Sequence, residues 1–345
     1  MAVESTTGGR HRSPAGPPRT GARAGAGAAV DFRATPRARR RGWYGAKRPV
    51  KRLLGWGPAN LAMRAAVAVA APGLRRTGRL PVPARVAEVT GLVPGAEPAA
   101  FTMLRPSACV VAAELYWGAG RRPGAADDLA LRVFAAAARR SAVLLDIGAY
   151  TGLFTLAGTA VNPRLRAHAF EIVPEVVHTL FDNCVRNRVL HRTTLHHVGV
   201  GDPATTVTMP ARSGDSALPC YYSAEMVFAD GVPVEVVALD SLTAAVPPGA
   251  PAVLKVDVEG TEAAVFEHGQ EFLAAHRPDI LCEVLPGADA DRLSGLLAPH
   301  GYRFHLVGER ALAPAGAPAP HDRFRDWFVT TRGGAELAAM GIPVA

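Results

Sequence analysis

The sequence predicts an α/β fold in which helices cover both faces of a mostly parallel β-sheet. From about residue 141 onward, short apolar runs alternate with segments whose apolar residues recur every three or four positions. The runs are apolar almost throughout, as in strands buried on both faces, and the recurring positions are typical of amphipathic helices. Such an alternation favours parallel strands joined by crossover helices.

Seven segments are candidate strands, and a helix precedes them. The helix is expected over residues 127–140, which begin with acidic residues and end with two arginines, as the helix dipole favours. The strands are expected at residues 142–147, 166–170, 194–200, 252–258, 279–284, 302–307 and 326–331. Residues 204–240 interrupt the alternation, and their pattern predicts a hairpin with a loop at residues 213–222.

Basic residues are concentrated at the N-terminus. Residues 1–80 contain 17 Lys and Arg against two acidic residues, whereas residues 81–345 contain 21 against 28. The net charge of +8 therefore belongs to the tail, and the body is not expected to form a basic nucleic-acid groove. We expect a basic extension without fixed structure over 1–80, a lead-in of helix and strand over 81–140, the main domain over 141–332 and a tail over 333–345.

Residues 50–80 allow two interpretations, a short basic helix that weakly contacts an acidic lipid surface or a flexible arginine-rich extension. The weak apolar stripe favours the extension. No apolar run reaches the roughly 18 residues of a membrane span. The four cysteines are far apart and form no C-x-x-C pair, which argues against a zinc site or a disulfide framework and for a cytoplasmic location.

The strongest local signal is the segment Asp146-Ile-Gly148-Ala-Tyr-Thr-Gly152, which follows a predicted strand and opens a helix. Its glycines allow the backbone to turn sharply and approach a ligand. In open α/β sheets, ligands bind at the carboxyl ends of the strands. The spacing lacks the middle glycine of the dinucleotide fingerprint. The alternative is an ordinary turn between a strand and a helix.

Two acidic residues follow the next two strands. Glu171 ends the second strand, 23 residues after Gly148, where a carboxylate can accept hydrogen bonds from both hydroxyls of a ribose. Asp202 follows the third strand and is placed to accept a hydrogen bond from an adenine amino group. A helix-start acid and a turn aspartate are the respective alternatives.

The fourth strand ends in Lys255-Val-Asp257-Val-Glu259-Gly260-Thr-Glu262. Four ionisable groups are more than a buried strand tolerates without partners or a function. Alternation directs Lys255, Asp257 and Glu259 to one face of the extended segment. The alternative is a buried network in which Lys255 pairs with Glu259 or Glu283.

Taken together, the motifs resemble the FkbM family of class I S-adenosylmethionine-dependent methyltransferases over about residues 141–331. The match to D-[VI]-G-A-N-x-G at residues 146–152 has Tyr150 in place of Asn, and the match to E-P-x-P at 171–174 has Ile172 in place of Pro. The other matches are N-x-x-x-N at Asn183 and Asn187, A-V-G-D at 199–202, L-D-x-L at 239–242, K-I-D-V-E-G-x-E at 255–262 and R-P…E at 277–283.

The resemblance implies a Rossmann-like sheet of seven strands, six parallel and the last antiparallel, with S-adenosyl-L-methionine across the ends of the first three. It also implies that residues 141–332 are a methyltransferase domain that methylates a hydroxyl oxygen of a small molecule, natural product or glycan. We expect the cofactor-binding residues to be Asp146, Gly148, Ala149, Tyr150, Thr151, Gly152, Glu171 and Asp202.

Methyl transfer to an alcohol requires removal of the hydroxyl proton. Candidate bases at the ends of the fourth and fifth strands are Asp257, Glu259, Glu262 and Glu283, and His321 precedes the last strand. We select Asp257, Glu283 and His321 as catalytic residues, with a solvated loop histidine as the alternative for His321. A magnesium ion held by Asp257 and Glu283 is a further alternative, but the sequence lacks a D-D/N pair and we predict no metal.

Two other classes of function compete with this prediction. A nicotinamide-dependent oxidoreductase would share the strand order and an acid like Glu171, but it should also have the middle glycine and a Tyr-x-x-x-Lys pair. A non-catalytic module whose basic tail docks on membrane or nucleic acid would not need to retain Asp146, Glu171 and Asp257. We therefore expect a hydroxyl-bearing small molecule or glycan as the partner, and no specific nucleic acid.

Overall fold

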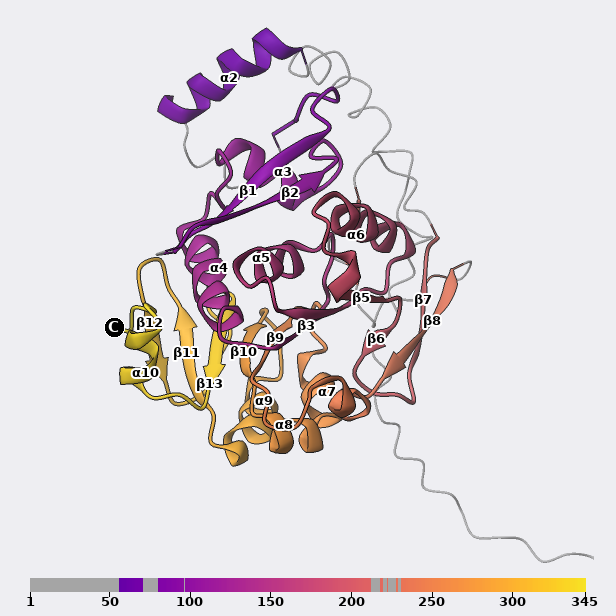
Figure 1. Cartoon of the computed structure of the whole chain (residues 1–345), viewed down its shortest axis with the longest axis vertical. Coiled ribbons are helices and arrows are strands. Elements are labelled where there is room, and N and C mark those ends of the chain that lie inside the picture. Colours follow the sequence, from indigo (N-terminus) through magenta and orange to yellow (C-terminus); the bar gives the residue numbers. More distant parts are fainter. Residues whose placement is uncertain are drawn as a thin grey trace, which may run out of the picture.

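An eight-stranded sheet forms the centre of the protein in the computed structural model, in the order β12-β11-β13-β10-β9-β3-β4-β5 (Figure 1). The structure describes residues 56–70, 80–95, 97–211, 218–219, 222, 228 and 231–345. The strands of this sheet are β3 (Val143–Ile147), β4 (Arg166–Phe170), β5 (Thr193–His196), β9 (Ala252–Val256), β10 (Asp279–Glu283), β11 (Arg303–Val307), β12 (Leu312–Ala315) and β13 (Asp326–Thr330).

The strand directions confirm the predicted fold class. β5, β4, β3, β9 and β10 are parallel neighbours. β13 is antiparallel to both β10 and β11, so β11 has the direction of the parallel strands. Six of the seven expected strands therefore share one direction and the last opposes them. β12 is an additional edge strand, antiparallel to β11, and it contains a proline, which an edge position tolerates.

The third expected strand, at 194–200, is divided in the structure. β5 ends at His196, and residues 199–200 form a separate strand, β6 (Gly199–Val200). β6 pairs in parallel with β8 (Val232–Val237), which pairs antiparallel with β7 (Thr206–Met209). The expected hairpin over 204–240 is confirmed by the β7–β8 pair, and its connection includes residues outside the described ranges.

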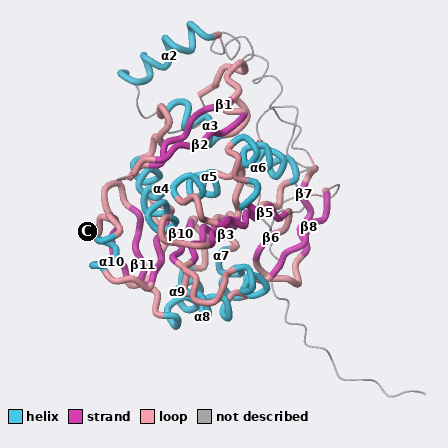
Figure 2. Tube along the Cα trace, in the orientation of Figure 1, coloured by secondary structure: helices cyan, strands magenta, loops and turns pink. Residues whose placement is uncertain are grey.

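Helices cover the two faces of the large sheet in separate layers (Figures 1 and 2). Alternate side chains of β3 enter opposite layers, since Leu144 packs with Phe134 of α4 whereas Leu145 packs with Phe266 of α7, as the two-residue period of a strand requires. The helices are α4 (Ala125–Ala138), α5 (Leu153–Val161), α6 (Pro174–Arg186), α7 (Glu262–Glu267), α8 (Gln270–His276), α9 (Ala290–Leu297) and α10 (Gly334–Ala339), with 3-10 helices η3 (Leu190–Arg192), η4 (Leu239–Ala245) and η5 (Ala298–His300).

An N-terminal hairpin and helix lie over the layer that contains α5 and α6 (Figure 2). They are β1 (Glu88–Val93), its antiparallel partner β2 (Ala99–Leu104) and α3 (Val110–Trp117). The side chains of Phe101 and Met103 in β2 are buried in the same cluster as Leu153 of α5 and Leu180 of α6. The lead-in expected over 81–140 is therefore packed against the main domain.

The structure differs from the expected extension at α2 (Gly57–Ala70), which is helical. Asn60 of this helix is buried, donates a hydrogen bond to the carbonyl oxygen of Pro81 at 3.2 Å and accepts one from the Tyr116 hydroxyl at 2.8 Å. The disorder expected for residues 1–50 concerns residues that lie outside the described ranges. None of the helices in the described ranges combines the length and the apolar character that a membrane span needs.

A chain that begins at residue 81 should keep its sheet, because every strand within the described ranges and the three larger hydrophobic clusters lie after this position. It should lose the hydrogen bonds that Asn60 makes with Pro81 and Tyr116 and the one that Trp117 donates to the Leu80 carbonyl oxygen, each worth about 1 kcal/mol. We expect a cooperative thermal transition at a lower midpoint by circular dichroism. Asn60→Ala in the full chain is the control and should reproduce part of the decrease, and loss of the cooperative transition on truncation would contradict the expectation.

Candidate active site

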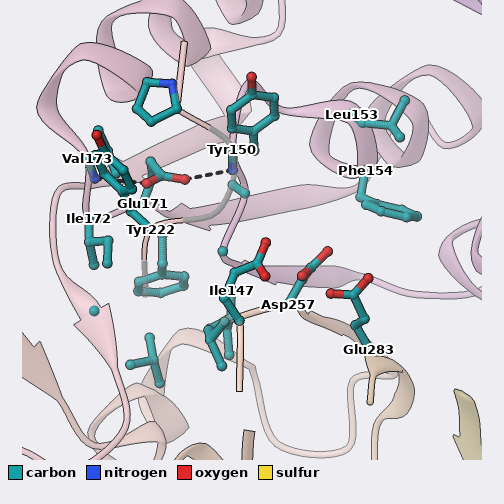
Figure 3. A pocket seen from close by; sticks show the side chains of 18 of the residues that line it. Ile147, Tyr150, Leu153, Phe154, Glu171, Ile172, Val173, Tyr222, Asp257 and Glu283 are labelled. Atoms are coloured by element: carbon teal, nitrogen blue, oxygen red, sulfur yellow. Dashed lines mark hydrogen bonds between the residues drawn. The ribbon is translucent and has the colours of Figure 1, made fainter. Parts of the chain in front are cut away.

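A cavity of about 370 Å³ opens at the carboxyl ends of β3, β4, β9 and β10. Gly148, Ala149 and Tyr150 of the glycine turn (residues 148–152) form one wall, and carboxyl groups at the ends of β4, β9 and β10 face it (Figure 3). The motifs that the sequence places at strand ends are thus brought together. This is the place where parallel α/β sheets bind ligands.

The glycine turn depends on the absence of a side chain at Gly148. The φ angle of Gly148 is +79°, in the left-handed region that favours glycine. A Cβ atom here would lie 1.8 Å from the carbonyl oxygen of Asp257. The backbone N–H groups of Gly148 and Ala149 both donate to the carbonyl oxygen of Phe170, at 3.0 and 2.9 Å. The turn is therefore held against the ends of both neighbouring strands.

Glu171 is buried beside the turn, and both of its oxygens are fixed by backbone donors. Oε2 accepts from the N–H of Tyr150 at 2.8 Å, and Oε1 accepts from the N–H of Val173 at 2.8 Å (Figure 3). Burial raises the pKa of Glu171 to about 7, although these backbone hydrogen bonds favour the ionised form and lower the pKa. Because each carboxylate oxygen has a second lone pair, the side chain can still accept hydrogen bonds from two ligand hydroxyls.

Asp146 bonds to the first turn of α5, directly after the glycine turn, and does not line the cavity. It is buried, and its Oδ2 accepts from both the N–H and the hydroxyl of Thr155, at 2.9 and 2.6 Å. Burial raises its pKa to about 6. Of the expected cofactor-binding residues, Gly148, Ala149, Tyr150 and Glu171 line the cavity, and Asp146, Thr151, Gly152 and Asp202 lie outside its lining.

Asp202 has local partners instead. Its Oδ1 accepts from the N–H of Ala204 at 2.9 Å, and the same oxygen lies 3.6 Å from Nε2 of His268. The side chain is 45% exposed. The structure thus gives Asp202 the geometry of the turn aspartate that was the alternative interpretation.

Three carboxylates form a cluster opposite the glycine turn. One oxygen each of Asp257, Glu259 and Glu283 lies within 4.8 Å of the others, a set that could hold a cation. Lys255 is 2% exposed, and its Nζ lies 3.4 Å from Asp257 and 3.3 Å from Asp326. These partners differ from the Glu259 and Glu283 that the network alternative had paired with Lys255.

The three carboxyl groups have different protonation states near neutral pH. Burial opposes ionisation of Asp257, but the charge of Lys255 and a hydrogen bond from Glu283 outweigh it and lower the pKa of Asp257. Burial and the nearby charge of Asp257 raise the pKa of Glu283 to about 9, although Arg325 lies 2.9 Å from it. The same two causes raise the pKa of Glu259 to about 7. At pH 7 the cluster therefore contains an ionised Asp257 next to a protonated Glu283.

Glu259 lines the cavity, although it was only one of several candidate bases in the sequence. Its φ angle of +57° is left-handed, a conformation that costs a residue with a side chain about 1–2 kcal/mol and that is often found at functional sites. The KVDVEG pattern contains no signal for this backbone strain. Glu262, another candidate base, is fully buried and accepts a hydrogen bond from Gly260 N–H at 3.0 Å, which fixes the turn after β9.

His321 is not brought to the cavity. It is exposed, its Nδ1 accepts from the backbone N–H groups of Arg323 and Phe324 at 3.1 and 3.3 Å, and its ring stacks on Phe324. The structure therefore favours the loop histidine over the catalytic interpretation.

The remaining wall comes from segments without a sequence motif. Val110, Val111 and Glu114 of α3 line the cavity together with Arg122 and Tyr222. Oε2 of Glu114 lies 2.9 Å from Nε of Arg122, and both side chains are largely buried. Sequence reasoning missed this wall, because only the packing of the N-terminal hairpin and α3 brings these residues to the strand ends.

Comparison with known proteins identifies the domain. Residues 146–304 match the family model described as the methyltransferase FkbM domain. Residues 146–304 are thus similar to an FkbM methyltransferase domain, and this part of the chain includes β4, β5, β9 and β10 of the large sheet.

Several solved structures are similar to the chain at low sequence identity. Methyltransferase FkbM from Methylobacillus flagellatus KT is 17% identical with a TM-score of 0.38, and the match covers 55% of this chain and 44% of that chain. Precorrin-6y C5,15-methyltransferase from Geobacter metallireducens GS-15 is 14% identical with a TM-score of 0.33, covering 59% and 86%. Aeropyrum pernix fibrillarin, in complex with S-adenosyl-L-methionine, is 13% identical with a TM-score of 0.34, covering 56% and 68%. No curated protein matches the chain.

The contact between Gly148 and Asp257 predicts a large effect of a single methyl group. Gly148→Ala should lower the free energy of unfolding by about 3 kcal/mol, because the left-handed φ angle and the clash with a backbone oxygen both oppose the new Cβ. Gly249→Ala is the matched control, since Gly249 has a φ angle of +73° but no atom within 4 Å of its Cβ position. It should lose only about 1 kcal/mol. Urea denaturation measures both, and equal losses would show that the contact is unimportant.

Proposed function

We propose that this protein is an S-adenosylmethionine-dependent O-methyltransferase that acts on a hydroxyl group of a small molecule, natural product or glycan. The observation that carries the proposal is the position of Glu171 and the Asp257–Glu283 pair around one cavity, on the two sides of the glycine turn. The first group suits a ribose and the second a hydroxyl with a transferable proton. The FkbM-type domain supports the same reaction class.

The residues of the cavity fit S-adenosylmethionine. The N–H groups of Gly148 and Ala149 already donate to the carbonyl oxygen of Phe170. We therefore propose that the turn packs against the cofactor by van der Waals contact, in the tight conformation that the absence of a Cβ at Gly148 allows. Glu171 would accept hydrogen bonds from the ribose hydroxyls. Apolar side chains that line the same end of the cavity would pack against the adenine, and they include Ile172, Val198 and Val200.

For this reaction the protein must chiefly position the two substrates and accept the proton of the hydroxyl group. When bound, S-adenosylmethionine supplies a methyl group attached to a positively charged sulfur. The sulfur leaves as a neutral thioether, and this leaving group needs no acid. Asp257, kept ionised by Lys255 and by the proton of Glu283, would accept a hydrogen bond from the acceptor hydroxyl and orient it. Glu259, with a pKa of about 7, is matched to take the proton near neutral pH.

The acceptor end of the cavity combines apolar and charged side chains. Phe154, whose ring centroid lies 5.1 Å from Nζ of Lys255, gives it apolar surface, and Glu114 and Arg122 give it hydrogen-bonding groups. A compound with several hydroxyls on a partly apolar frame would satisfy both kinds of side chain. This mixture therefore supports a small molecule or glycan as the acceptor.

Binding of S-adenosylhomocysteine should depend on Glu171. Glu171→Gln removes the charge and keeps the shape, and we expect the binding free energy to weaken by about 1.5–3 kcal/mol, the range for a hydrogen bond to a charged group. Asp202→Asn is the control and should bind within about twofold of the unmodified chain, because Asp202 lies outside the cavity lining. Isothermal calorimetry measures both, with NAD as a second ligand that should not bind. Tight binding of NAD instead would overturn the proposed function.

Turnover should depend on Asp257 more than on the other partner of Lys255. Asp257→Asn should lower kcat by roughly a hundredfold and change cofactor affinity little, whereas Asp326→Asn also removes an ion pair with Lys255 but does not line the cavity and should cost far less. The acceptor is first found by screening hydroxylated metabolites and glycosides for release of S-adenosylhomocysteine. Equal losses in the two variants would make Asp257 a structural partner of Lys255 only.

A further inference from the structure

We infer that Asn183 is a positioning residue that couples the glycine turn to the acceptor wall formed by α3. This inference rests on the proposed function, because it assigns the turn to the cofactor and α3 to the acceptor. Asn183 lies on α6 and is fully buried. Its side chain joins two segments that are far apart in sequence.

The two ends of the Asn183 amide have different partners. Nδ2 donates to the carbonyl oxygen of Thr151, in the glycine turn, at 2.8 Å. Oδ1 accepts from the backbone N–H of Leu104, at the end of β2, at 2.8 Å. Because an amide side chain has a donor and an acceptor at fixed separation, this single group sets the distance between the turn and β2.

Asn187, one helical turn later, bonds to the hairpin and to the backbone of α6 through its side chain, and none of these bonds reaches the glycine turn. Its Oδ1 accepts from the N–H of Thr102 at 2.7 Å, and its Nδ2 donates to the carbonyl oxygens of Thr102 and Asn183, both at 2.7 Å. Four residues of helix rise about 6 Å, and two residues of strand extend about 6.6 Å. The N-x-x-x-N spacing therefore matches alternate residues of β2, and the two amides occupy the strand edge that β1 leaves open.

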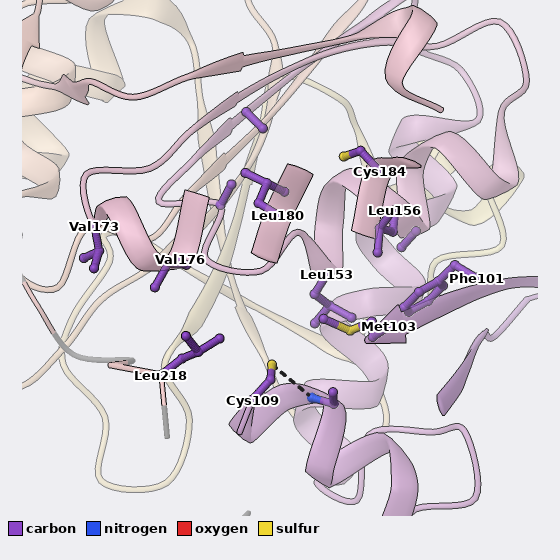
Figure 4. Packing of buried hydrophobic residues seen from close by; sticks show 14 of the residues in the cluster. Phe101, Met103, Cys109, Leu153, Leu156, Val173, Val176, Leu180, Cys184 and Leu218 are labelled. Carbon is purple, nitrogen blue, oxygen red and sulfur yellow. Dashed lines mark hydrogen bonds between the residues drawn. The ribbon is translucent and has the colours of Figure 1, made fainter. Parts of the chain in front are cut away.

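A second link closes the connection between the turn and α3. The Thr151 hydroxyl lies 3.1 Å from Sγ of Cys109, which is the N-cap of α3 and accepts from the N–H of Ala112 (Figure 4). Thr151 is fully buried. It is thus held at its carbonyl by Asn183 and at its hydroxyl by Cys109, and α3 begins directly after Cys109 and contributes Val110, Val111 and Glu114 to the cavity lining.

The packing around these polar links is apolar and continuous. Phe101 and Met103 of β2 pack in one cluster with Leu153 and Leu156 of α5 (Figure 4). Such contacts hold the hairpin on the domain but do not direct it, since hydrophobic association is non-directional. The hydrogen bonds of Asn183 supply the direction, so the inferred role is to fix where the acceptor wall stands relative to the cofactor turn.

The test compares Asn183→Ala with Asn187→Ala. Asn187→Ala is the matched control, because Asn187 makes three of these hydrogen bonds, none of them to the glycine turn, and Asn183 makes two, one of them to the turn. A positioning role predicts that only Asn183→Ala loosens the turn. In hydrogen exchange of the cofactor-free protein, both variants should accelerate exchange in residues 99–104. Only Asn183→Ala should accelerate it in residues 148–156, by tenfold or more.

Cofactor affinity gives a second readout in the same two variants. Asn183→Ala should weaken binding of S-adenosylhomocysteine by tenfold or more, and Asn187→Ala by less than threefold. If Asn183→Ala does not fold, Asn183→Ser, which keeps a small polar group but cannot bridge both partners, is compared in its place. Equal exchange of residues 148–156 in the two variants would overturn the inference. An unmodified chain that fails to bind S-adenosylhomocysteine would overturn the proposed function alone, because the exchange measurement needs no ligand.

Discussion

The close approach of the glycine turn to the end of β9 is the constraint on which the rest of the site depends. Pairing between β3 and β9 continues past the strands, where Asp257 N–H donates to the carbonyl oxygen of Ile147 at 3.0 Å. Gly148 then passes so near the Asp257 carbonyl that a Cβ has no room. One backbone contact therefore places the turn that we assign to the cofactor next to the carboxylates that we assign to the acceptor.

The buried charges beside this contact are better explained by the state of Asp257 than by stability. Removing Lys255 and its two carboxylate partners from water costs about as much as their attraction returns, so such clusters contribute little net stability. Their effect on protonation is larger, because Lys255 keeps the pKa of Asp257 low while the charge of Asp257 helps to raise that of Glu283. Lys255 thus favours the ionised state of Asp257, whereas burial and the charge of Asp257 keep Glu283 protonated. Each can then take a different part in binding an acceptor hydroxyl.

Sequence pattern was sufficient for the parts of the fold that local periodicity controls. The pattern predicts β3, β4, β9 and β10, and the acids that follow them, at nearly their observed positions. Both strand burial and the polarity of strand ends are visible in a few consecutive residues. The position of Asp202 depends on where the chain turns after β5. The residues at 194–200 read as one continuous strand, so the sequence does not show that the chain turns between β5 and β6. Tyr150 has a φ angle of +49°, a conformation in which asparagine is several-fold enriched. The structure thereby explains the usual family residue at a position where this chain departs from it.

The residues that line the cavity come from two kinds of sequence segment, those inside the family match and those outside it. The sequence motifs therefore point to the reaction more directly than to the acceptor. The turn, Glu171 and Asp257 lie within residues 146–304, which match the methyltransferase family. Val110, Glu114 and Arg122 precede that range, and Arg325 follows it. These side chains reach the cavity through tertiary packing of the hairpin, α3 and β13, none of which carries a motif of its own. We propose that these flanking side chains complete the acceptor end of the cavity, and that Asn183 keeps them in register with the matched range.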